Sequence, residues 1–174
     1  TPFPTRDMRE LLDITWRRMV SRGGYGIVAQ LRSWLPGPIG GVYWVYQDNQ
    51  HVSPYVPVYA GVTEISPLYK NYDPEMFSED SARWAIDFVD NLLYLRWQDA
   101  YKDLRKVRDP LEDGFFESLT EMDRRAADLY QRNPGEARKL LTDFSRQCME
   151  QAVDVFRKLR TQLISKYSNN RLGL

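Results

Sequence analysis

The sequence predicts an α+β fold in which antiparallel strands come first and three long helices follow. Residues 25–62 are rich in β-branched and aromatic side chains and are interrupted by Pro/Gly turns, whereas apolar residues recur every three or four positions from Ser78 onward. Runs of strands followed by runs of helices favour α+β over alternating α/β. We therefore expect a sheet-forming segment, residues 1–77, and a helical segment, residues 78–174, as two parts of one domain.

Composition excludes several classes of protein. A chain of 174 residues is long enough for one domain with a substantial core. Its 24 Lys and Arg balance 24 Asp and Glu, so no overall positive field would attract nucleic acid or an anionic membrane. No apolar run approaches the roughly 20 residues of a bilayer span, and no signal-peptide pattern is present. We predict a soluble chain and leave its compartment open between cytoplasm and a secreted or periplasmic location.

The sheet-forming segment contains one predicted helix and three predicted strands. Apolar residues at helical spacing predict a short helix over residues 5–18. Alternation in residues 25–34 and a β-branched, aromatic run in residues 41–48 predict an antiparallel pair joined by a Pro/Gly turn. Residues 55–62 form a third extended run, and Pro57 within it predicts an edge or bulged strand, because proline cannot donate a ladder hydrogen bond.

The helical segment follows an aperiodic stretch, residues 63–77, which we predict to be an ordered loop. Pro110 predicts the end of the first helix, because the residue before a proline disfavours the α conformation. Asn133 and Pro134 are a typical N-cap and first helical residue. We predict three amphipathic helices, residues 78–108, 111–131 and 134–167.

Three strands are few for a sheet that must bury both an aromatic face and a helical layer. The sequence therefore predicts that further strands come from upstream residues or from a partner chain. The chain also starts at Thr1 without a methionine, from which we expect that upstream residues were cleaved or left out.

Three side chains invite a catalytic interpretation, and each has a simpler one. His51 lies in a turn-like stretch without a Gly-x-Ser-x-Gly elbow, so a solvent-facing loop histidine is favoured over a general base. Cys148, the single cysteine, lies on the apolar stripe of the last helix, which favours core packing over a thiol nucleophile. Thr1 precedes a proline, which favours a trimmed end over an N-terminal nucleophile. No Cys or His spacing predicts a metal site.

Arginines cluster around the approach to the first strand, at Arg17, Arg18, Arg22 and Arg32. A guanidinium is a rigid bidentate donor for a carboxylate or a developing oxyanion, so one of them is a candidate for a catalytic site. Solvated surface arginines are the alternative. The aromatic residues around the strands are better explained by sheet packing than by base stacking, because this stretch carries almost no lysine.

Two linked stretches, VAQLRSWLPGPIGGVYW and SPYVPVYAGVTEISPLY, resemble a known family. They are similar to the C-terminal part of the cysteine dipeptidases of the N-terminal-nucleophile hydrolase superfamily, the dipeptidase A group, to which the secernins are related. The similarity continues through DSARWAIDFVDNLLYLRWQDAYKDLRKV and covers the chain from about Arg18 to about residue 170.

The resemblance implies a four-layer αββα hydrolase that cleaves dipeptides of broad sequence and needs no cofactor. An N-terminal cysteine would attack the amide carbonyl with its own α-amine as base. That cysteine would lie upstream, so the resemblance implies that this chain is a C-terminal fragment, or one chain of a cleaved enzyme, and inactive alone. Its partners would be dipeptide substrates and the upstream portion of the enzyme, and homo-oligomerisation stays open.

The family's Arg-x-Ile-(Ser/Ala/Cys) stretch matches RMVS here, which implies that Arg18 is the arginine beside the nucleophile. Arg22 is the alternative, because many relatives carry an arginine just after the small residue. The chain departs from the family at Gly23-Gly24-Tyr25-Gly26, where relatives usually have threonines and a histidine or phenylalanine. Two other readings stay open: a non-enzymatic protein-interaction module, and an inactive relative that keeps the fold.

Overall fold

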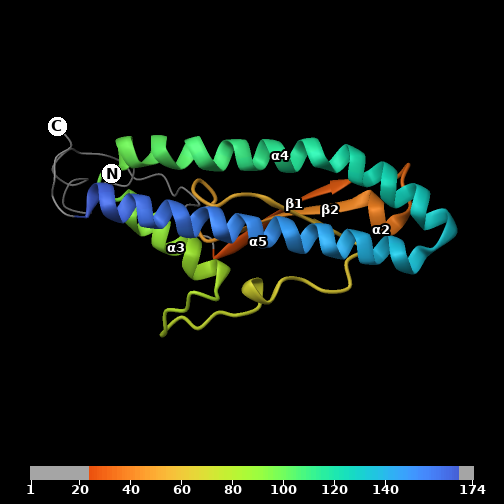
Figure 1. Ribbon diagram of the computed structural model, residues 1–174, viewed down its shortest axis with the longest axis horizontal. Coiled ribbons are helices and arrows are strands. Elements are labelled where there is room, and N and C mark those ends of the chain that lie inside the picture. Colours follow the sequence, from red (N-terminus) through yellow and green to blue (C-terminus); the bar gives the residue numbers. More distant parts are fainter. Residues whose placement is uncertain (1–23, 169–174) are drawn as a thin grey trace, which may run out of the picture.

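A computed structural model describes residues 24–168, so the predicted helix over residues 5–18 lies outside the described part. Three strands precede the long helices, which confirms the predicted α+β fold (Figure 1). None of the helices in the described part is long and apolar enough to cross a membrane. The elements in chain order are β1 Tyr25–Leu31, α2 Gly37–Gly40, β2 Gly41–Gln47, β3 Val56–Tyr59, the 3₁₀ helix η1 Pro67–Tyr69, α3 Ala82–Leu93, α4 Trp97–Arg132 and α5 Pro134–Tyr167.

The three strands form one antiparallel sheet in the order β1-β2-β3. Val28 pairs with Trp44, and Trp44 pairs with Pro57, so the predicted hairpin is confirmed and Pro57 lies in an edge strand as expected. The Pro/Gly turn forms a single helical turn, α2. Gly40 is required there, because a Cβ at this position would lie 2.5 Å from the Arg32 carbonyl oxygen.

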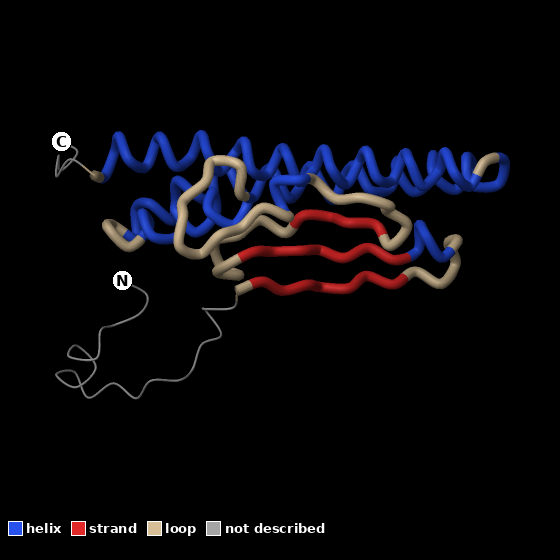
Figure 2. The backbone as a smooth tube through the Cα atoms, turned by 90° about the horizontal axis from the view of Figure 1, so that it is seen from below, coloured by secondary structure: helices blue, strands red, loops and turns tan. Residues whose placement is uncertain are grey.

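Helix α5 covers the outer edge of β3. The backbone N–H of Tyr59 donates to Ser145 Oγ at 3.2 Å, and the N–H of Thr63 donates to Thr142 Oγ1 at 3.0 Å. Side chains of α5 thus satisfy backbone donors that another strand would otherwise take. Figure 2 shows the long helices on the β3 side of the sheet and β1 as the strand farthest from them.

Two apolar clusters hold the elements together, and α5 contributes to both. One cluster joins the sheet to the α4–α5 hairpin. Its large buried members include Ile39, Trp44, Tyr59, Phe115 and Leu141. The other cluster joins α3 to the opposite ends of α4 and α5, and includes Ile86, Leu93, Leu104, Phe156 and Leu163.

The predicted first helix, residues 78–108, is wrong, because the structure divides this stretch between two helices, α3 and α4. Helix α3 spans Ala82–Leu93 and ends in a tightened turn, in which the N–H of Arg96 donates to the Leu93 carbonyl at 3.2 Å. Helix α4 then begins at Trp97 and passes through Pro110 to Arg132, so the predicted break at Pro110 and the separate helix over residues 111–131 are also wrong.

Burial explains why α4 continues through its proline. Leu104 and Leu111 are buried on either side of Pro110, so the apolar stripe of the helix is continuous across it. Pro110 and Lys106 are both exposed residues, so the hydrogen bond that the Lys106 carbonyl loses lies on the solvent side of α4 and not on its buried stripe. Tertiary packing therefore overrides the local preference. The last predicted helix, residues 134–167, is confirmed, and its Asn133 cap accepts the Glu136 N–H at 3.2 Å.

Replacing Pro110 with alanine should stabilise the protein. The substitution restores a backbone donor for the Lys106 carbonyl and removes the ring clash, so we expect the free energy of unfolding to rise by about 1–3 kcal/mol. Urea unfolding measures it, with Glu117→Ala at an exposed α4 position as the matched control. A loss of stability in Pro110→Ala would contradict a continuous α4.

Candidate functional site

The two predicted catalytic arginines, Arg18 and Arg22, lie outside the described residues, and so does Thr1. Their roles therefore stay predictions. The structure does describe Gly24, which is two residues after Arg22 and directly precedes β1. The start of β1 is therefore the described part that lies nearest to these arginines along the chain.

Arg32, the fourth arginine of the cluster, is a structural residue. It is 8% exposed, and its guanidinium donates to the Ile39 carbonyl at 2.8 Å and to the Asp123 carboxylate. Asp123 also accepts the Tyr59 hydroxyl at 2.7 Å. Burial, together with the Asp123 carboxylate, raises the pKa of Tyr59 above its ordinary value, so the phenol stays protonated and donates. The guanidinium of Arg32 thus makes its hydrogen bonds to groups inside the fold.

Cys148 cannot serve as a thiolate nucleophile in this fold. It is 4% exposed inside the sheet–helix cluster, as predicted. Burial raises the pKa of its thiol to about 12, whereas cysteine nucleophiles react as thiolates near neutral pH. It is also the only cysteine among the 174 residues of the chain.

His51 lies in the turn after β2, and its side chain is half-buried rather than fully solvent-facing. Its backbone N–H donates to Asn49 Oδ1 at 3.0 Å, and its carbonyl accepts from Arg108 on α4. This residue therefore helps to anchor the turn to α4.

The edge of β1 that faces away from β2 is free of any described strand. The Asp48 N–H donates to the Gly24 carbonyl at 3.0 Å, and the Arg32 N–H donates to the Gly40 carbonyl at 2.8 Å. Antiparallel ladders alternate, so the even-numbered residues from 24 to 32 bond to β2. The outward backbone groups belong to Tyr25, Ile27, Ala29 and Leu31.

This free edge lacks the features that protect natural edge strands. Tyr25, Ile27 and Leu31 are 78%, 56% and 75% exposed. The segment Tyr25–Leu31 contains no charge and no proline, which are the usual means of blocking a further strand. The edge is therefore competent to pair with another strand.

A mostly apolar groove of about 440 Å³ lies between β1, β2 and α4. Phe116 of α4 stacks on Trp44 with ring centroids 4.1 Å apart, and Phe116 is 55% exposed. Glu112 accepts the Tyr55 N–H at 2.8 Å, and burial raises the pKa of its carboxyl. The groove is lined by Val28, Ala29, Gln30, Trp44, Tyr55, Glu112 and Phe116.

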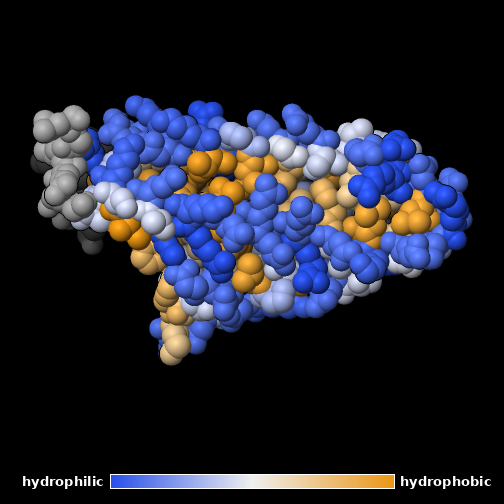
Figure 3. Space-filling model, in the orientation of Figure 1, coloured by the Kyte–Doolittle hydropathy of each residue, from blue (hydrophilic) through white to orange (hydrophobic). Residues whose placement is uncertain are grey.

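The segment between η1 and α3 projects from the body of the molecule and carries apolar side chains (Figures 1 and 3). Phe77 packs edge-on against Phe88 at 5.8 Å and against Trp84 at 5.9 Å. The Arg160 guanidinium lies 5.8 Å from the Phe77 ring centroid. These contacts hold the base of the projection, while Met76 is 68% exposed.

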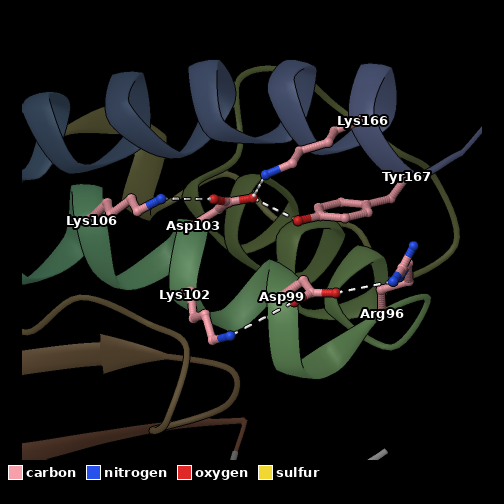
Figure 4. Close-up of a pocket in the computed structure, with 7 residues that line it drawn as sticks. All are labelled: Arg96, Asp99, Lys102, Asp103, Lys106, Lys166 and Tyr167. Carbon is pink, nitrogen blue, oxygen red and sulfur yellow. Dashed lines mark hydrogen bonds and ion pairs between the residues drawn. The ribbon is translucent and has the colours of Figure 1, made fainter. Parts of the chain in front are cut away.

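A polar pocket of about 270 Å³ lies between the start of α4 and the end of α5 (Figure 4). The Asp103 carboxylate accepts Lys166 Nζ at 2.6 Å and the Tyr167 hydroxyl at 2.7 Å, with Lys106 Nζ at 3.5 Å. Burial alone would raise the pKa of Asp103, but the Lys166 and Tyr167 hydrogen bonds lower it below its ordinary value. Because Lys166 and Tyr167 of α5 donate to a carboxylate of α4, these bonds tie the end of α5 to the start of α4. We call this group of bonds the Asp103 clamp.

The described residues contain no group of three or more His, Cys, Asp or Glu side chains that could hold a metal ion. Sequence reasoning missed two polar connections that the structure reveals, Arg32 to Asp123 and Arg83 to Asp48. The Gln-Asp-Asn stretch at Asp48 gave a weak signal, since aspartate is tolerated in left-handed turns. Asp123 had no local signal.

The model of peptidase family C69 matches residues 10–109, which is more than half of the chain. The chain belongs to peptidase family C69. This dipeptidase A family of cysteine peptidases is the one that the sequence motifs predicted. The matched stretch contains Arg18, Arg22, the three strands and α3. A search of curated proteins found no match.

Membership in C69 raises the question of whether Cys148 could be the catalytic cysteine. A cysteine peptidase requires a reactive thiolate, and the single cysteine of this chain is buried in a helical stripe outside the matched residues. The similarity predicted beyond residue 109 stays a prediction.

Replacing Asp103 with asparagine should reduce stability at neutral pH and have less effect in acid. A carboxyl whose folded pKa is lowered contributes stability above its unfolded pKa of about 3.9 and loses it as the pH falls through the folded pKa. We expect a loss of about 1 kcal/mol at pH 7 and a smaller one near pH 3, measured by urea unfolding. Asp113→Asn, at an exposed α4 position outside this pocket, is the control. Equal losses at both pH values would contradict the clamp.

Proposed function

We propose that this chain is the C-terminal portion of a cysteine dipeptidase of the N-terminal-nucleophile type, whose nucleophilic cysteine lies upstream. The observation that carries the proposal is Cys148. The residue is 4% exposed, and this burial raises the pKa of its thiol to about 12, so the thiol is unsuited to nucleophilic attack. A C69 peptidase built with this chain would therefore take its nucleophile from other residues.

The free edge of β1 supports the same proposal. An uncharged strand with outward backbone groups at Tyr25, Ile27, Ala29 and Leu31 suits pairing with a strand of the upstream portion. Side chains alternate along a strand, so Tyr25, Ile27 and Leu31 share one face with Tyr43, which is 39% exposed. A second sheet packed on this face, as in an αββα fold, would bury them, each such side chain contributing roughly 1.5–3 kcal/mol.

The catalytic contribution of this chain would be an arginine. In the proposed reaction the upstream cysteine gives its thiol proton to its own α-amine, and its sulfur attacks the dipeptide carbonyl. The protonated amine then donates that proton to the leaving amine as the C–N bond breaks, and water hydrolyses the resulting thioester. Arg18, or alternatively Arg22, would donate hydrogen bonds to the developing oxyanion or to the substrate carboxylate, for which a guanidinium has the right geometry. No cofactor takes part in this scheme.

An inactive relative that keeps the fold is the second candidate. It is favoured by the Gly23-Gly24-Tyr25-Gly26 stretch, which replaces the residues usual in the family directly after the candidate arginines. Activity of the full-length protein separates the two candidates.

The catalytic role is tested in the full-length enzyme with a panel of dipeptides. We expect Arg18→Ala, or Arg22→Ala if the alternative holds, to lower kcat/KM by about 100-fold or more, the usual cost of losing an oxyanion donor. Cys148→Ala should keep activity, and Arg124→Ala, which removes an exposed α4 guanidinium, is the control. Full activity in both Arg18→Ala and Arg22→Ala would remove these arginines from the mechanism. A full-length protein inactive on all dipeptides would favour the inactive relative.

Assembly through the β1 edge is tested by co-expressing the upstream portion with this chain. Ile27→Pro removes an outward N–H without removing a bond to β2, so we expect it to abolish co-purification. Ile27→Val, which keeps the N–H and the β-branched side chain, is the control and should still bind. Equal binding by both variants, or a chain that stays a folded monomer without any partner, would contradict the proposed assembly.

A further inference from the structure

Strand β1 is exposed on both of its faces as well as along its free edge. Ile27 is 56% exposed on one face, and Val28 is 54% exposed on the other. A strand paired at the edge, together with a sheet packed on the Ile27 face, would still leave Val28 in water. The Val28 face is therefore open to a contact of its own.

The Val28 face is the floor of the apolar groove beside α4. Val28 pairs with Trp44 across β1 and β2, so their side chains share this face. The Trp44 indole donates to Gln30 Oε1 at 3.1 Å. Phe116 lies one turn after Glu112 on α4 and stacks on Trp44, so α4 is the wall of the groove. Helix α4 therefore covers Trp44, which is 4% exposed, and leaves Val28 open.

The groove has few hydrogen-bonding groups to offer to a backbone. Gln30 accepts from the Trp44 indole, and Glu112 accepts from the Tyr55 N–H. The backbone groups of β1 point inward to β2 or outward at the free edge, and not into the groove. An extended segment lying here would keep its own N–H and C=O groups unpaired, which is costly once they are buried. A helix satisfies its backbone internally, so a helix is the element that fits.

Glu112 specifies the polar part of such an occupant. Its carboxylate is half-buried, and among the described residues it accepts one hydrogen bond, from the Tyr55 N–H at 2.8 Å. Burial already raises the pKa of this carboxyl, and Arg108 counteracts part of that rise. A docked helix would remove more water from Glu112, and a buried carboxylate needs hydrogen-bond partners. The occupant should therefore carry a hydrogen-bond donor beside its apolar stripe.

We propose that an amphipathic helix of the upstream portion docks in this groove beside α4, with its apolar stripe on Val28 and Phe116 and a hydrogen-bond donor facing Glu112. The inference rests on the proposed function and deepens it, because it gives the same partner a second contact surface. The groove is continuous with the β1 edge, since Val28 lies between Ile27 and Ala29, whose backbone groups point outward.

Photocrosslinking in the full-length protein identifies the occupant. The photoreactive residue p-benzoylphenylalanine is placed at Phe116 or at Val28, and at Leu95, which is as exposed as Val28, for the matched control. From the two groove positions we expect crosslinks to one upstream stretch, at residues three or four apart as on one face of a helix. The control position should not reach that stretch. Crosslinks to residues 1–23 or to a second copy would overturn the inference, and so would the absence of crosslinks.

Substitutions measure how much the groove contributes to assembly. When the upstream portion is co-expressed with this chain, Phe116→Ala and Val28→Lys should each reduce the amount that co-purifies by about tenfold or more. Both residues are more than half exposed, so the variants should fold, and Leu95→Lys is the control. Glu112→Gln keeps an acceptor for Tyr55 but removes the charge, so we expect about a threefold loss. Unchanged recovery in Phe116→Ala and Val28→Lys contradicts the docked helix, and in Glu112→Gln it contradicts the donor.

The outcomes separate this inference from the proposed function. If Ile27→Pro abolishes co-purification while the groove variants bind normally, the docked helix is wrong and assembly through the β1 edge stands. If the native polypeptide has no upstream portion, both the proposed function and the docked helix are refuted.

Discussion

The bonds of the buried Arg32 guanidinium are the interactions on which the arrangement of β1, α2, β3 and α4 depends. It joins the end of β1 to the α2 turn through the Ile39 carbonyl, and to α4 through Asp123, which in turn accepts the Tyr59 hydroxyl of β3. A buried charge is tolerated only when it is paired and hydrogen-bonded, so these partners must occupy their places together. Breaking such a pair typically costs about 3–5 kcal/mol. One side chain thus couples the turn, the sheet and the long helix.

The two edges of the sheet differ. Ser145 and Thr142 of α5 satisfy backbone donors of the β3 side, while the outward groups of β1 meet no described strand. The helices therefore close one edge and leave the other competent for pairing. An edge without charge or proline is a liability in a protein that works alone, and it is the expected surface of one that is completed by another segment.

Local patterns predicted the strands and missed the features that depend on distant contacts. The alternation in residues 25–34 and the proline of β3 are local signals, and the structure follows them. Pro110 was misread because its local effect is outweighed by an apolar stripe that is buried on both sides of it. Asp123 lies 91 residues from Arg32, and no spacing rule connects them. Arg83 and Asp48 were missed for the same reason, while Arg18 and Arg22 rest on the family motif.

The free edge of β1 begins directly after the stretch in which the family motif places the candidate arginines. Tyr25 and Ile27 direct their backbone groups outward, whereas the Gly24 carbonyl turns inward to Asp48 and Arg83. On the proposed function, the strand that completes the sheet would pair with the backbone that follows those arginines. Ordering a backbone segment costs conformational entropy, so the pairing that assembles the sheet would also offset the cost of ordering the start of β1.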